Sequence, residues 1–160
     1  MAVFLRKMLG IGQLPDDMRA QVEAEGVLLL AEFVPVTYRF SGHVPGKVAK
    51  GNLASYVGAL ALTRQRVLAT LSSVPKKAAR SADHRWDAPE GTMVDATLDE
   101  SGLLLDVPDM SAVDPNFSGS VSLHYKAALS AEVLAALPQR TFAFDVPPKF
   151  VYSVCGVPVR

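Results

Sequence analysis

The chain has 160 residues, of which 49% are hydrophobic and 20% are charged, and its formal net charge is zero. This length and composition fit one globular domain with a core of its own; they exclude a disordered chain and disfavour a nucleic-acid-binding protein. No stretch approaches the roughly 20 apolar residues of a membrane span, and Arg6 and Lys7 interrupt the only segment that resembles a secretion signal. Cys155 is the only cysteine. We therefore expect a cytoplasmic protein without a disulfide.

The first 26 residues are predicted to form an N-terminal segment that ends in a short helix over Leu14–Gly26. Pro15 suits the first turn of this helix, two aspartates follow where the positive end of the helix dipole favours acidic side chains, and Gly26 suits the position after the last turn. Residues 1–12 are too apolar for a solvated tail, so we expect them to pack on the domain or in the groove of a partner.

Residues 27–160 are predicted to form one β-rich domain. Its first strand covers Val27–Phe40, where β-branched, aliphatic and aromatic residues predominate. Pro35 lacks a backbone N–H and therefore indicates an edge position or a bulge in this strand. The next segment, Ser41–Ser55, is rich in Gly, Pro and Asn and is predicted to be a loop.

Two β-hairpins are predicted in the middle of the chain. Tyr56–Thr63 and Arg66–Ser72 flank a turn of two residues, and Met93–Leu98 and Leu103–Val107 flank a turn made of Asp, Glu, Ser and Gly. The stretch between the hairpins is predicted to be irregular, with one edge strand near Ala78–His84.

Ser118–Lys126 is the most regular predicted strand, because apolar and polar residues alternate along it. Val121, Leu123 and Tyr125 are expected to face the core, while the residues between them face solvent.

The C-terminal part is predicted to contain a short helix and two strands. Ser130 suits the N-cap of a helix that runs to Leu137, and the strands cover Thr141–Val146 and Phe150–Val154. Consecutive strands joined by tight turns predict a mainly β fold, an antiparallel meander closed into a barrel or sandwich, with a short helix at the N-terminus and another near the C-terminus.

The segment from Gly58 to Ala69, GALALTRQRVLA, resembles a phrase of bacterial pleckstrin-homology-like and GRAM-like domains. In those domains a strand ending in Leu-Thr is followed by a two-residue turn, an arginine and a second apolar strand. The meander and the helix at Ala131–Leu137 are also similar to this family, whose C-terminal helix plugs one end of a seven-stranded barrel. The chain is similar as well to proteins of actinobacteria, through Glu25–Ala31 and Ala135–Pro138.

This resemblance implies a fold and leaves the ligand open. Members that bind phosphoinositides carry a paired basic motif around the first loop. Lys47 and Lys50 lie in the corresponding loop here, but the strand that follows begins at Tyr56 without a basic pair.

The charged residues form two blocks although the net charge is zero. No acidic residue lies between Phe33 and Ala82, whereas Asp83 to Asp114 contains nine acidic residues and a single basic one, Arg85. Because sequence neighbours in a meander are usually neighbours in the sheet, the blocks predict one basic and one acidic side. The predicted ligand- or partner-binding residues are seven cations and one aromatic residue, namely Arg39, Lys47, Lys50, Arg64, Arg66, Lys76, Lys77 and Trp86. The aromatic residue has two interpretations, an exposed anchor for a partner or a lid folded over one barrel end.

No group of residues predicts catalysis, a bound metal or a cofactor. His43, His84 and His124 lack the close spacing of metal ligands. The glycine-containing segment at 42–47 lacks the spacing and the Ser or Thr of a phosphate-binding loop. Cys155 has no histidine near it in sequence and is predicted to be a small buried hydrophobic residue.

These observations predict a non-enzymatic interaction module that binds a protein partner or another copy of itself. The alternative is a lipid-headgroup or small-ligand-binding domain that uses the basic surface of residues 33–82, with an anionic lipid surface as one such partner. An enzyme whose catalytic residues converge only in space is a third alternative. No nucleic-acid partner and no transmembrane segment are predicted.

Overall fold

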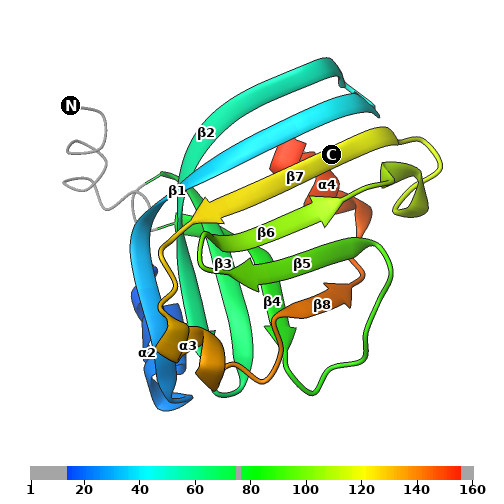
Figure 1. Cartoon of the computed structure of the whole chain (residues 1–160). Helices are drawn as coiled ribbons and strands as arrows, with labels where there is room; N and C mark the ends of the chain where they lie inside the picture. Colours follow the sequence, from blue (N-terminus) through cyan, green and yellow to red (C-terminus); the bar gives the residue numbers. More distant parts are fainter. Residues whose placement is uncertain (1–13, 75–76, 156–160) are drawn as a thin grey trace.

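A computed structural model of the chain describes residues 14–74 and 77–155, and it leaves the side chains of residues 72–80 undescribed. Within these ranges one antiparallel sheet has eight strands in the order β4-β3-β2-β1-β7-β6-β5-β8, and it curls into a nearly closed barrel (Figure 1). The strands are β1 (Val27–Val44), β2 (Lys47–Thr63), β3 (Arg66–Val74), β4 (Lys77–Arg85), β5 (Val94–Asp99), β6 (Gly102–Val107), β7 (Ser118–Lys126) and β8 (Thr141–Phe144). The helices are α2 (Asp16–Ala24), the 3-10 turn η1 (Met110–Ala112), α3 (Ala131–Ala136) and α4 (Pro148–Cys155). The predicted mainly β, antiparallel fold class is confirmed.

The predicted N-terminal helix is confirmed as α2, which covers the outer face of β2 and β3. Val22 packs there with Ala59, Ala61 and Leu68. The other face of β2 contributes Leu60 to the barrel core, so the middle of this strand is buried on both sides. The predicted apolar packing of residues 1–12 lies outside the described residues.

The predicted loop at Ser41–Ser55 is wrong, because β1 and β2 continue through it as one long hairpin. Only Pro45 and Gly46 form its turn, between the paired residues Val44 and Lys47. Glycines made the segment resemble a loop, but one of them, Gly42, allows close approach of two strands. Gly42 lies opposite Gly119 of β7, and a methyl group on either residue would clash with backbone of the other strand.

The predicted irregularity at Pro35 is confirmed. The register of β1 against β2 shifts between Ala31 and Val34, and Phe33 within the shift has a positive φ of 57°. Pairing with β7 begins only at Val36. Pro35 therefore lies just before the paired part of β1 and β7, where a backbone N–H is not needed for a hydrogen bond to β7.

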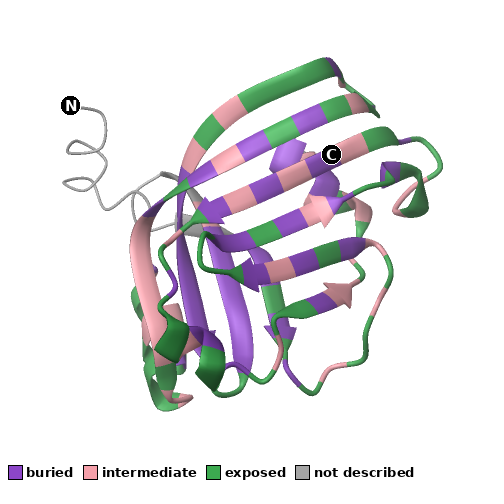
Figure 2. Cartoon of the chain, viewed as in Figure 1, coloured by how far each residue is buried: buried purple, intermediate pink, exposed green. Residues whose placement is uncertain are grey.

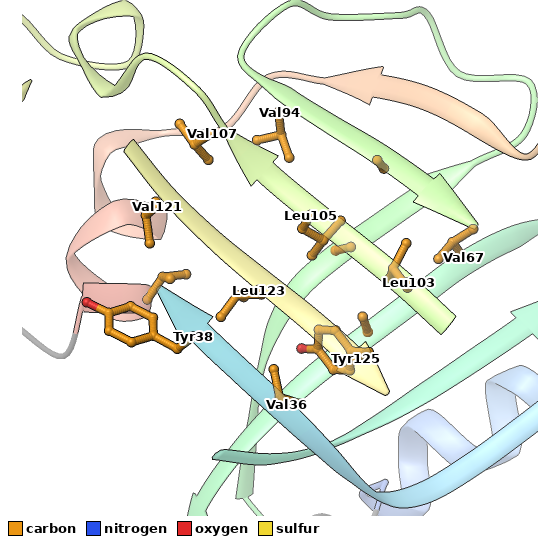
Figure 3. Close-up of a cluster of buried hydrophobic side chains, with 14 of the residues drawn as sticks. Val36, Tyr38, Val67, Val94, Leu103, Leu105, Val107, Val121, Leu123 and Tyr125 are labelled. Carbon is orange, nitrogen blue, oxygen red and sulfur yellow. The ribbon is translucent and has the colours of Figure 1, made fainter. Parts of the chain in front are cut away.

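The remaining hairpins and the strand β7 are confirmed. Side chains from β1, β5, β6 and β7 converge in the core that Figure 3 shows, and Val121, Leu123 and Tyr125 are buried within it as predicted. Along β7 buried residues alternate with half-buried ones (Figure 2). Ser130 caps α3 by accepting a hydrogen bond from the backbone N–H of Val133.

The predicted final strand at Phe150–Val154 is wrong, because these residues lie in α4. Pro148 occupies the first helical position, where its fixed φ is favourable. Val151, Val154 and Cys155 recur at helical spacing and are all buried in the barrel core. Burial of this apolar face outweighs the strand propensity of the β-branched residues.

Candidate functional site

The sheet does not close on itself, since no ladder joins β4 to β8 within the described residues. Aromatic side chains bridge the two edges instead. The ring of His84 on β4 stacks on Phe142 of β8, with ring centroids 4.8 Å apart, and lies 5.9 Å from Phe144. Burial lowers the pKa of His84, against a smaller opposite effect of Glu90, so the imidazole is neutral at pH 7. We call the region between β4 and β8 the seam.

A pocket of about 510 Å³ opens at the seam, between the two sheet edges and α4. Its walls are largely apolar, and they include Leu71, Ala82, Phe144, Val146, Phe150 and Val154. This volume falls within the range of small-molecule sites, which is roughly 300–1,000 Å³. We call it the seam pocket.

Three of the polar residues that line the seam pocket are bonded within the protein. Asp83 accepts hydrogen bonds from Arg66 Nη1 at 2.9 and 3.1 Å. Asp145 Oδ1 accepts from the backbone N–H groups of Thr92 at 2.7 Å and Met93 at 3.2 Å. The hydroxyl of Ser81 is buried and hydrogen-bonded.

Ser81 belongs to a buried hydroxyl network at the inner wall. Its Oγ lies 3.2 Å from the backbone oxygen of Ala69 and contacts the Tyr125 hydroxyl. The Tyr125 hydroxyl in turn lies 3.0 Å from the backbone oxygen of Thr70, so the two hydroxyl hydrogens are shared among these three contacts. Burial raises the pKa of Tyr125, so the phenol stays protonated as a hydrogen-bond donor.

Trp86 lies at one end of the seam, where it folds back over the barrel. Its indole is buried, donates a hydrogen bond to the backbone oxygen of Thr63 at 2.9 Å and meets Phe142 edge to face. This placement favours the lid interpretation of Trp86.

Two predicted binding residues are used inside the fold. Lys47 Nζ donates to the backbone oxygen of Cys155 at the end of α4, at 2.8 Å, and lies 5.7 Å from the ring centroid of Tyr38. Arg66 is buried against Glu25 and Asp83. Burial alone would lower the pKa of Arg66, but the hydrogen bonds to both carboxylates outweigh it and raise that pKa.

The other predicted cations do not meet at one place. Arg39, Lys50 and Arg64 are all exposed, but Lys50 and Arg64 lie toward opposite ends of β2, roughly 45 Å apart along the strand. Lys76 and the side chain of Lys77 lie outside the described residues.

The thiol of Cys155 is buried among apolar side chains. Burial raises its pKa, against smaller opposite effects of Tyr38 and Lys47, so this cysteine lacks the depressed pKa of a nucleophilic thiolate. Among the described residues, no three or more His, Cys, Asp or Glu side chains gather as metal ligands.

Comparison with protein-family models, curated proteins and solved structures found no match to this chain. The relationship to pleckstrin-homology-like domains stays a prediction. No helix in the described part of the chain has both the length and the apolar character needed to cross a lipid bilayer.

Sequence reasoning missed the seam pocket. Its lining comes from β3, β4, the end of β8 and α4, and α4 was predicted to be a strand. The one available signal was the run of apolar residues around Phe144 and Phe150, which predicted burial but not a cavity.

Proposed function

We propose that this domain is a non-enzymatic binding protein for a small apolar molecule, which occupies the seam pocket. The observation that carries the proposal is the pocket itself, whose apolar walls and few polar groups are typical of ligand sites.

The chemistry of the pocket supports binding over catalysis. Asp83, Asp145 and Ser81 are already held by donors or acceptors of the protein. In the part of the chain that the structure describes, the exposed Ser153 has no hydrogen bond to a base that would activate it.

Binding of the neutral fluorescent probe N-phenyl-1-naphthylamine tests this proposal. Val146→Trp places an indole in the pocket, and we expect it to weaken probe binding at least tenfold. Ser153→Trp blocks the mouth from an exposed position and should act in the same direction. Val48→Trp is the matched control, because Val48 is 70% exposed on β2 and lies outside the pocket lining.

Equal probe affinity of the wild type and both blocking variants would refute the seam pocket as the binding site. Urea unfolding of each variant verifies that the substitutions leave the fold intact.

Binding to a protein partner, a second copy or an anionic surface through the basic residues stays a prediction. Exposed Arg39 and Lys50, on the paired strands β1 and β2, are the described cations best placed for it. Sedimentation at low and high salt tests self-association, and liposome binding by the wild type and Lys50→Glu tests the lipid surface.

A further inference from the structure

Among the described residues, the inner part of the seam pocket has no side chain with a hydrogen-bonding group left for a ligand. Ser81 is the polar side chain there, and its hydroxyl is already bonded to Ala69 and Tyr125. The surrounding wall is formed by aliphatic and phenyl groups such as Leu71, Phe150 and Val154. A polar group placed at this depth would lose its bonds to water and find no free partner among the described side chains, so this part of the pocket favours hydrocarbon.

The mouth of the pocket has a different character because α4 places two polar side chains there. Lys149 and Ser153 are four residues apart on this helix, which brings them to the same face. Both are exposed and both line the pocket. Within the described residues, neither side chain has a hydrogen bond or an ion pair.

The two carboxylates at the mouth already accept hydrogen bonds within the protein, whereas Lys149 has no such partner among the described residues. Asp83 is paired with Arg66 at 2.9 Å. Asp145 is held by the two backbone N–H groups at Thr92 and Met93. Among the described side chains of the pocket, the cation and the hydroxyl of α4 are therefore the donors left to bind a ligand, and an ammonium together with a hydroxyl donor fits an anionic oxygen.

We propose that the ligand of the seam pocket is a hydrocarbon chain ending in a carboxylate, with the chain against the apolar wall and the carboxylate bound by Lys149 Nζ and Ser153 Oγ. This assignment rests on the proposed function of the pocket.

The test compares dodecanoate, dodecanol and dodecylamine, which share one chain and differ in the end group. The affinity of each compound is measured from its displacement of bound N-phenyl-1-naphthylamine. Each compound is used at concentrations where it is dissolved as single molecules. We expect dodecanoate to bind about tenfold more tightly than dodecanol, since a charged hydrogen bond contributes on the order of 1.4 kcal/mol, and dodecylamine to bind most weakly. Each methylene removed from the carboxylate should weaken binding about fourfold.

Lys149→Met keeps the length of the side chain and removes its charge. This variant should bind dodecanoate only as tightly as dodecanol, and its affinity for dodecanol should equal that of the wild type. Ser153→Ala should lower the affinity for dodecanoate about threefold. Lys126→Met is the matched control, an exposed lysine on β7 outside the seam pocket.

Equal affinity for the three end groups, preference for the amine, or an unchanged preference in Lys149→Met would overturn the carboxylate assignment while leaving an apolar pocket. Failure of the probe and all three chains to bind would overturn the proposed function together with this inference.

Discussion

Replacing Arg66 with methionine should destabilise the protein more than any comparable change at a surface cation. The Arg66 side chain is 10% exposed, and its guanidinium makes hydrogen bonds to Glu25 at 3.0 Å, Asp83 at 2.9 and 3.1 Å, and Gln21 at 3.3 Å. These partners tie α2 and β4 to β3. Methionine keeps the apolar stem but removes the guanidinium that both carboxylates contact.

The expected cost follows from the exposure of the groups left behind. Breaking a fully buried ion pair costs about 3–5 kcal/mol. Here the side chains of Glu25 and Asp83 are 15% and 27% exposed, so water recovers part of the loss, and we expect about 2–3 kcal/mol. For a chain of this size that corresponds to a melting temperature lower by roughly 5–10 °C.

Arg85→Met provides the matched control on the neighbouring strand. Arg85 pairs with Asp87 at 3.2 Å, but the two side chains are 56% and 76% exposed, so we expect a cost below about 1 kcal/mol. Urea unfolding followed by the fluorescence of Trp86 measures both variants. Free energies of unfolding within 0.5 kcal/mol of each other would refute the reasoning. Asp83→Asn should also cost less in the Arg66→Met background than in the wild type.

Three further predictions concern strand packing, pH and the buried hydroxyl network. Gly42→Ala should cost several kcal/mol more than Gly51→Ala in urea unfolding; both residues have positive φ, but only Gly42 meets backbone where the methyl group would lie. The stability of the wild type should fall as the pH drops below about 6.5, because the pKa of His84 is lowered in the folded state and the unfolded chain binds the proton more readily. If the stability of His84→Gln depended on pH in the same way as that of the wild type, this reasoning would be contradicted. Tyr125→Phe should cost about 1–2 kcal/mol, since it removes the hydroxyl bonded to Ser81 and to the backbone of β3; an unchanged melting temperature would show that this bond contributes nothing.

The elements that could be predicted from the sequence depend on neighbours along the chain. The alternation in Ser118–Lys126 sets which side chains of β7 face inward. The turn between β5 and β6 is favoured by Asp99, whose carboxylate accepts the backbone N–H of Ser101. Ser130 caps α3 through a residue three positions on. Such local interactions have the same partners whatever the rest of the chain does, so residue order alone determined the β-rich, antiparallel fold class.

Only the tertiary structure decided the features whose partners lie far apart in the chain. Gly42 extends a strand because it meets Gly119 across the sheet. Residues 150–154 form a helix because the barrel core buries one side of it. Arg66, which was predicted to bind a ligand or partner, is buried against carboxylates from two other parts of the chain. The seam pocket exists because α4 meets two sheet edges that no ladder joins within the described residues. Hydrophobic burial has no direction along the sequence, so periodicity predicts that a residue is buried but not which residues surround it.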